Sequence, residues 1–248
     1  MRDVLLLHAG IADSRMWSPQ RRALENSGFH VNAPDLRGFG QRPLEPVHFS
    51  YARDVEEALD GAAAVVGSSL GGRVALELAL HRPDLVEQLV VIAPGLSGWA
   101  WSEATRAGWA EEEQAFERGD LEAAAEAVLR LWVDGPNRSP KEVDPDVRSA
   151  VREMVLRSYE LQRHAWDAGA EEDDILDPPL IGRLGEIRCP ALVVVGDDDV
   201  ADMQAIAEHV ADSIDGARLV RIPGTAHLPS LERPNEVNDV LLTFLGHR

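Results

Sequence analysis

The chain is poor in the residues that several common functions require. Its 248 residues include one cysteine, Cys189, and one lysine, Lys141, and the formal net charge is −19 at pH 7. A single thiol allows no internal disulfide and no cysteine-rich zinc site, so no metal is expected. A chain this acidic is repelled by phosphate backbones, which argues against nucleic-acid binding.

Long apolar runs are also missing. The first run, residues 4–7, is too short for the apolar region of a signal peptide, and no run approaches the length of a membrane span. The sequence therefore predicts a cytoplasmic protein with no membrane partner. With 45% hydrophobic and 27% charged residues, the composition is that of an ordinary globular protein large enough for one substantial domain.

Short apolar runs alternate with helical patterns, which is typical of a parallel sheet with crossover helices. Strands are predicted near residues 4–7, 29–33, 62–67, 88–93, 190–195 and 218–222, and helices near 15–27, 51–59, 70–82, 202–212 and 234–246. Between Gly95 and about Arg188 the pattern is helical and acidic, and no strand is predicted. We therefore expect a core formed by residues 1–95 and 189–248 and an inserted helical lid formed by residues 96–188.

Residues 67–71, Gly-Ser-Ser-Leu-Gly, stand where a short apolar run gives way to a helical pattern. G-x-S-x-G between a strand and a helix is a nucleophile elbow, a sharp turn that holds the serine hydroxyl clear of the sheet. The glycines are needed because a Cβ at either position would collide with the neighbouring strand or helix. Ser69 is therefore the predicted nucleophile, and Ser68 occupies the x position.

A serine nucleophile needs a base and a carboxylate that orients the base, and after such an elbow they follow in the order Asp or Glu, then His. The predicted strand 190–195 leads to three consecutive aspartates, Asp197, Asp198 and Asp199, and the predicted strand 218–222 leads to His227. Functional groups of open α/β sheets collect beyond the carboxyl ends of the strands. His227 is the predicted base, with an acid among the three aspartates.

Together these segments resemble the α/β-hydrolase superfamily, and the chain is most similar to its small lidded serine hydrolases, such as the 3-oxoadipate enol-lactonase-like esterases. The resemblance covers residues 4–95 and roughly 180–246. Besides the elbow, it is carried by Leu-Leu-Leu-His-Ala-Gly at 5–10, Asp-Leu-Arg-Gly-Phe-Gly at 35–40, Gly-Asp-Asp-Asp at 196–199 and Gly-Thr-Ala-His at 224–227. It implies an α/β-hydrolase fold whose mainly parallel sheet has about six strands, because the usual N-terminal hairpin has no counterpart before residue 4.

The resemblance also implies roles for individual residues. Gly-x-x-Asp points to Asp199 as the acid. The oxyanion hole needs two backbone N–H groups, which we expect from Leu70 and from Gly10, with Ile11 as the alternative to Gly10. The implied reaction is hydrolysis of a small-molecule ester or lactone through an acyl-enzyme, without a cofactor.

Two alternatives use the same residues. One is carbon–carbon bond hydrolysis or perhydrolase chemistry with the same triad, and the other is a small-molecule receptor built on a hydrolase fold. Because one fold and triad serve many chemistries, these alternatives stay open in the sequence, as do the identity of the substrate and the oligomeric state.

Five of the six tryptophans fall in the predicted lid. An aromatic wall above the nucleophile would explain this concentration and would favour small apolar or aromatic acyl groups. The residues expected to line the substrate pocket are Ile11, Ser68, Trp99, Trp101, Trp132, Trp166 and Leu228.

Overall fold

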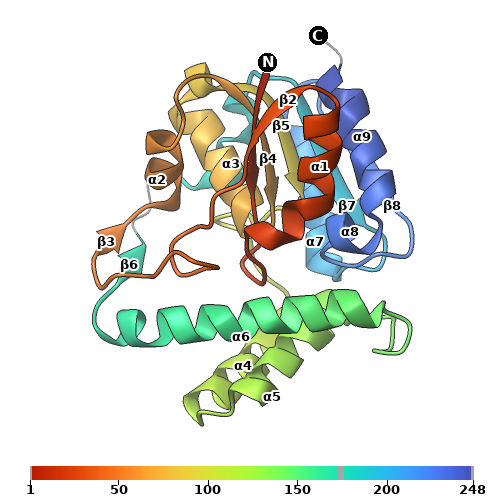
Figure 1. Ribbon diagram of the computed structural model, residues 1–248. Helices are drawn as coiled ribbons and strands as arrows, with labels where there is room; N and C mark the ends of the chain where they lie inside the picture. Colours follow the sequence, from red (N-terminus) through yellow and green to blue (C-terminus); the bar gives the residue numbers. More distant parts are fainter. Residues whose placement is uncertain (1, 173–175, 247–248) are drawn as a thin grey trace.

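The computed structural model describes residues 2–172 and 176–246. Six parallel strands form the central sheet in the order β2-β1-β4-β5-β7-β8 (Figure 1). They are β1 (Arg2–Leu7), β2 (Phe29–Asn32), β4 (Ala63–Ser68), β5 (Val86–Ile92), β7 (Ala191–Gly196) and β8 (Arg218–Ile222). The predicted six-stranded parallel sheet is therefore confirmed.

The two faces of the sheet are covered by helices, which explains the continuous burial of strands within it. Every residue of β4 and β7 is buried. The sheet is built in opposite directions from β1, and right-handed crossovers then place the connecting helices on opposite faces. Helix α1 (Ser18–Asn26) packs with α9 (Pro234–Gly246), whereas α2 (Tyr51–Glu57) packs with α3 (Leu70–His81), and α7 (Ala201–Ser213) covers β7.

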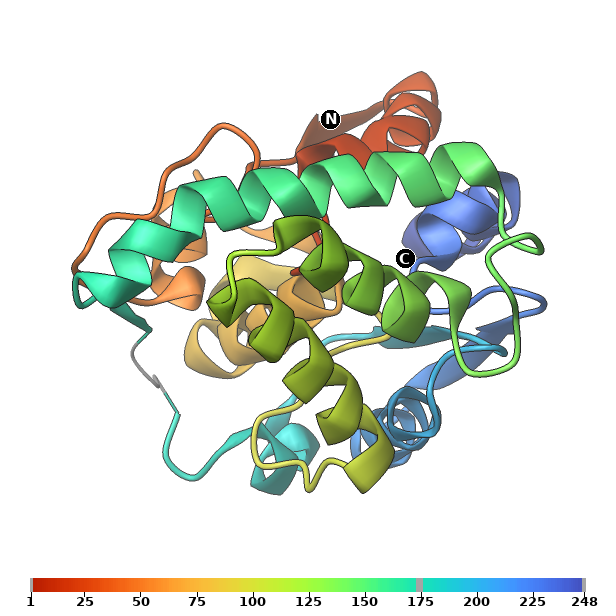
Figure 2. The same cartoon turned by 90° about the horizontal axis from the view of Figure 1, so that it is seen from below.

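Residues 96–188, here called the inserted segment, leave the sheet after β5 and return before β7. They form α4 (Glu103–Glu117), α5 (Leu121–Val128) and α6 (Pro145–Asp167). These helices lie beyond the carboxyl ends of the strands, and the long helix α6 crosses that side of the molecule (Figures 1 and 2). Helix α5 runs directly into a π-helical turn, η3 (Leu129–Asp134). Turns of this kind are rare and often occur at functional sites.

The prediction that residues 95–188 contain no strand is wrong. Glu171–Glu172 (β6) pairs in parallel with His48–Phe49 (β3) and ties the end of α6 to the loop before α2. A strand of two residues is too short to show the periodicity from which strands are predicted.

Five short helical turns complete the described fold: η1 (Ser14–Trp17), η2 (Pro83–Leu85), η4 (Leu180–Gly182), η5 (Leu184–Glu186) and α8 (Pro229–Glu232). Within residues 2–172 and 176–246, no helix has the length and apolar character needed to cross a membrane.

Candidate active site

Ser69 stands at the tip of the turn between β4 and α3, with φ of 50° and ψ of −110°. A positive φ is strained for serine, and such strain is found where the surrounding structure enforces it, often at functional sites. A Cβ at Gly67 would lie 2.1 Å from the carbonyl oxygen of Gly71, and one at Gly71 would lie 2.2 Å from that of Leu7. The predicted steric need for glycine on both sides of the turn is therefore confirmed.

The structure brings Ser69, His227 and Asp199 together. His227 Nε2 lies 2.8 Å from Ser69 Oγ, and His227 Nδ1 lies 2.9 Å from Asp199 Oδ2. The His227 and Asp199 residues are only 2% and 4% exposed. A carboxylate facing Nδ1 holds the imidazole proton there, so Nε2 is left free to accept the proton of the serine hydroxyl.

The three consecutive aspartates after β7 differ sharply in their surroundings. Asp197 is exposed and lies 3.9 Å from Arg221, and Asp198 is half-buried. Asp199 is buried, and its second carboxylate oxygen, Oδ1, accepts a hydrogen bond of 2.8 Å from the N–H of Val200. Of the three, Asp199 is the one whose carboxylate meets His227.

Two segments that carry the predicted oxyanion donors lie side by side. A Cβ at Gly10 would be 3.5 Å from Leu70 Cβ, and the N–H of Gly71 donates to the His8 carbonyl at 3.0 Å. Leu70 is the first residue of α3, where backbone N–H groups have no partner within the helix and the dipole favours negative charge. In the described part of the chain, no turn or capping hydrogen bond uses the N–H of Leu70, Gly10 or Ile11.

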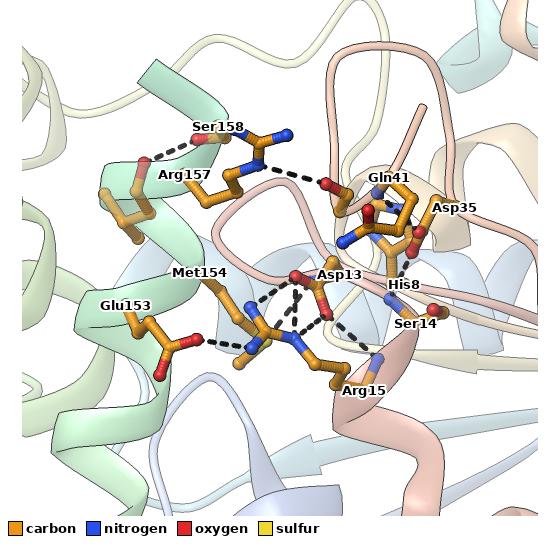
Figure 3. A network of polar contacts seen from close by, with 12 residues as sticks. His8, Asp13, Ser14, Arg15, Asp35, Gln41, Glu153, Met154, Arg157 and Ser158 are labelled. Carbon is orange, nitrogen blue, oxygen red and sulfur yellow. Dashed lines mark hydrogen bonds and ion pairs between the residues drawn. The ribbon is translucent and has the colours of Figure 1, made fainter. Parts of the chain in front are cut away.

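The loop that carries Gly10 and Ile11 is held at its start by a buried histidine. His8 Nδ1–H donates to the Ala9 carbonyl at 2.9 Å, and Nε2 accepts from the N–H of Leu36 at 2.9 Å. Burial lowers the pKa of His8, so the ring stays neutral and can donate through one nitrogen while it accepts through the other. Asp35 fixes the other end by accepting from the N–H groups of Ser14 and Gln41, both at 2.9 Å (Figure 3).

Helix α6 also holds this loop from the side of the inserted segment. Arg15 contacts Asp13 at 2.8 Å and Glu153 on α6 at 2.5 Å (Figure 3). The N–H of Asp13 points to the sulfur of Met154, 3.4 Å away, and Arg157 donates to the Gly40 carbonyl at 3.3 Å. The geometry of the loop that carries Gly10 and Ile11 therefore depends on both the sheet and the inserted segment.

Ser69 and His227 open into a cavity of about 470 Å³, a size suited to a small ligand. Three tryptophans of the inserted segment, Trp101, Trp109 and Trp132, form a continuous aromatic wall in it, with neighbouring ring centroids 4.9 and 6.3 Å apart. The Trp132 ring also lies 4.5 Å from the His227 ring, centroid to centroid. The remaining lining residues are Gly10, Ile11, Leu70, Arg73, Gly95, Leu96, Ser97, Glu112 and Met203.

Of the residues expected in the pocket, the structure places Ile11, Trp101 and Trp132 on its wall and the other four elsewhere. Ser68 ends β4 and is fully buried, as is Leu228 in the core. The Trp99 indole N–H lies 3.3 Å from Asp202 instead, and Trp166 is 43% exposed near the end of α6. A count of tryptophans in a helical region cannot tell which face of each helix looks inward.

Two charged residues of the cavity were missed from the sequence. Arg73 lies one helical turn beyond Ser69 and pairs with Glu77 at 2.9 Å and with Glu172 of β6 at 2.6 Å. Glu112 lies three residues after Trp109 on α4, a spacing that puts both on one helix face. Burial raises the pKa of Glu112, although the Tyr159 hydroxyl donates to its carboxyl group at 2.7 Å. Both residues could have been found from helical spacing, since Arg73 lies four residues after Ser69 and Glu112 lies three residues after Trp109.

A family model described as the alpha/beta hydrolase family matches residues 4–240. The chain belongs to this family. Within residues 2–172 and 176–246, no group of three or more His, Cys, Asp or Glu side chains could hold a metal ion.

Similar proteins are esterases and hydrolases, which makes this family member a hydrolase enzyme. The pimeloyl-[acyl-carrier protein] methyl ester esterase of Nitrosospira multiformis is 28% identical, over 94% of this chain and 90% of that protein. A solved thermophilic esterase from Thermogutta terrifontis is 26% identical with a TM-score of 0.79, over 99% of this chain and 90% of the other. The solved enol-lactonase of Burkholderia xenovorans is 25% identical with a TM-score of 0.78, over 99% and 92%.

Proposed function

We propose that this family member is a serine hydrolase that cleaves small esters or lactones through an acyl-enzyme on Ser69. The observation that carries the proposal is the chain of contacts from Ser69 Oγ to His227 at 2.8 Å and from His227 to Asp199 at 2.9 Å. Such a chain supplies a nucleophile, a base and an orienting carboxylate in one place. The esterases and the lactonase among the similar proteins support the same reaction class.

The reaction proceeds in two halves. Ser69 Oγ attacks the carbonyl carbon while its proton passes to His227 Nε2, and the carbonyl oxygen becomes an oxyanion facing the N–H groups of Leu70 and Gly10. The bond from the acyl carbon to the leaving oxygen then breaks while His227 protonates that oxygen; the alcohol of an ester departs, whereas that of a lactone stays tethered to the acyl group on Ser69. Water attacks the acyl carbon and gives one proton to His227, which passes it to Ser69 Oγ as the acyl–serine bond breaks, so that the acid and free Ser69 are released. Each oxyanion donor contributes about 3 kcal/mol to lowering the barrier.

Residues 1–95 and 189–248 act in this proposal as the catalytic core, and residues 96–188 act as a lid that selects the substrate. The wall of Trp101, Trp109 and Trp132 suits a compact apolar or aromatic acyl group. Arg73 is the cation of the cavity, but it already faces two carboxylates, Glu77 and Glu172. A substrate carboxylate would have to compete with them and would approach a chain of net charge −19. We therefore expect neutral substrates.

A panel of short p-nitrophenyl esters and small lactones tests the proposal. Wild type should turn over members of both groups, and Ser69→Ala should lose turnover. Ser68→Ala is the matched control, because it removes a neighbouring hydroxyl that does not line the cavity. The proposal fails if no member of the panel is hydrolysed, or if Ser69→Ala hydrolyses the panel as fast as the control does.

A further inference from the structure

The π-helical turn η3 of the inserted segment contacts the loop that carries His227. The carbonyl of Trp132 accepts a hydrogen bond of 3.2 Å from the backbone N–H of His227, and the two rings lie 4.5 Å apart. The inserted segment is thus joined to the backbone of the proposed base itself.

The same turn also approaches the loop that carries the proposed acid. Gly135 follows η3 with φ of +73°, and a Cβ at this position would lie 2.4 Å from the carbonyl oxygen of Asp198. Only a glycine lets the two backbones come this close. The end of η3 therefore rests directly against the residue before Asp199.

One ion pair fastens the end of η3 to the loop that carries His227. Arg138 donates to the carbonyl groups of Val133 and Asp134 at 2.7 and 2.9 Å, and to that of Gly224 at 2.9 Å. It also pairs at 2.6 Å with Glu232, whose other carboxylate oxygen accepts 2.8 Å from the N–H of Ala226.

The side chains of Arg138 and Glu232 are only 10% and 7% exposed. Removing Arg138 would take the ion-pair partner from a mostly buried carboxylate and a donor from three backbone carbonyls, and removing Glu232 would take the partner from a mostly buried guanidinium and the acceptor from the N–H of Ala226. Arg138 therefore bridges the end of η3 to Gly224, three residues before His227. Glu232 binds the backbone N–H of Ala226, the residue next to His227.

From these contacts we propose that Arg138 and Glu232 are positioning residues that hold His227 within hydrogen-bond distance of Ser69. They make catalysis depend on how the inserted segment packs against the core. The proposal rests on the serine-hydrolase function above. Neither residue lines the substrate cavity, so their effect is expected on turnover rather than on substrate binding. An error of about 1 Å in the placement of a reacting group costs on the order of 100-fold in rate.

The test compares Arg138→Gln, Arg138→Lys and Glu232→Gln with the control Arg183→Gln. Arg183 belongs to the same inserted segment and also pairs with a glutamate, Glu186, but it lies outside η3, and its partner is exposed and only three residues along the chain. In Glu232→Gln the amide NH₂ would face the guanidinium if the oxygen keeps the Ala226 N–H, so the bridge breaks with little change in shape. Rates with p-nitrophenyl acetate are divided by the concentration of active sites, counted with a fluorophosphonate, so that misfolded protein does not enter the comparison.

We expect kcat to fall about 10- to 100-fold in Arg138→Gln and Glu232→Gln with KM within about twofold of wild type. Arg138→Lys should recover part of the loss, because an ammonium can keep the pair with Glu232 but not all of the carbonyl contacts. The control should match wild type. The proposal is overturned if Arg138→Gln keeps kcat within about twofold of the control; if that variant is insoluble, Glu232→Gln and Arg138→Lys are judged by the same criterion.

A second measurement separates this proposal from the proposed reaction. The proton between His227 Nδ1 and Asp199 should give a downfield ¹H NMR resonance, which can be recorded without substrate. Its loss or shift in Arg138→Gln, but not in Arg183→Gln, supports the positioning role. An unchanged resonance in Arg138→Gln contradicts that role. A wild type that retains the resonance but hydrolyses no ester contradicts the proposed reaction instead.

Discussion

Replacing Asp199 by asparagine should disable the base without disturbing its position. Asp199 uses one oxygen for His227 Nδ1 and the other for the N–H of Val200. In the asparagine variant the single carbonyl oxygen is drawn to the Val200 N–H, because an NH₂ group there would face another donor. The NH₂ group then faces His227 Nδ1 and favours the tautomer that is protonated on Nε2. That nitrogen can no longer accept the Ser69 proton.

The expected loss follows from this change of tautomer. In a serine triad it costs up to about 10⁴-fold in kcat, which corresponds to about 5.5 kcal/mol of barrier. Little of this loss should come from unfolding, because the asparagine side chain fits the same space and keeps the hydrogen bond to Val200. KM should change far less than kcat, since Asp199 does not line the cavity.

The assay is steady-state hydrolysis of p-nitrophenyl acetate by Asp199→Asn, with Asp197→Asn and Asp198→Asn as matched controls. Both controls remove one negative charge from the same loop, so they correct for any change in the electrostatic field. They should stay within a few-fold of wild type because neither carboxylate meets His227. Near-normal turnover by Asp199→Asn, together with inactivity of either control, would show that the acid has been assigned to the wrong residue.

Three further predictions concern the nucleophile, the aromatic wall and the entry to the inserted segment. A fluorophosphonate should label Ser69 alone, because the elbow presents this hydroxyl to His227; peptide mapping that places the label on buried Ser68 would contradict the assignment. Trp109→Ala should lower the kcat/KM preference for neutral aromatic esters over matched carboxylate-bearing esters about 3- to 10-fold, whereas exposed Trp166→Ala should leave the ratio unchanged; an unchanged ratio in Trp109→Ala would count against the wall. Asp202→Asn should cost about 1.5–3 kcal/mol of unfolding free energy at pH 7, because this carboxylate accepts hydrogen bonds from Ser102, Thr105 and Trp99. Burial raises the pKa of Asp202, but these hydrogen bonds outweigh the effect of burial and hold the pKa below 3.8. The stabilisation by Asp202 is therefore complete above that pH and is lost as pH falls through the lower folded-state pKa. Denaturant titrations in which the difference in unfolding free energy between wild type and Asp202→Asn is the same at pH 7 and pH 2.5 would refute this account.

The sheet could be predicted because strands within it, such as β4 and β7, are buried on both faces. Runs such as residues 190–195 are apolar at every position, and each is followed by a clear turn signal. The strands β3 and β6 could not be predicted, because two residues paired across more than a hundred positions of sequence depend on where α6 ends. The π-helical turn η3 was equally hidden, since its sequence continues the helical pattern of α5.

For the site, local chemistry in the sequence pointed to Ser69 and to the loops of the proposed acid and base, but to only part of the cavity wall, namely Ile11, Trp101 and Trp132. Elbow and loop residues are read from spacing along the chain, whereas a wall depends on how helices rotate against each other. Trp166 was expected inside and is exposed, while Trp109 lines the cavity from a neighbouring helix. Arg73 was overlooked because only one face of the helix after the elbow is turned toward the cavity, and the sequence does not show which face that is.

The contact between Trp132 and His227 limits how freely parts of this enzyme can be exchanged. Segments that connect the elements of a rigid scaffold vary more than the scaffold and carry function, so the inserted segment is the natural part to graft from a relative. Here a graft would remove the carbonyl that receives the His227 N–H and the arginine that braces the loop beside it. A transplanted segment would therefore have to reproduce the η3 turn and its glycine before it could bring a new specificity. Chimeras joined outside residues 129–138 respect this boundary, whereas chimeras joined within them divide one functional unit between two parents.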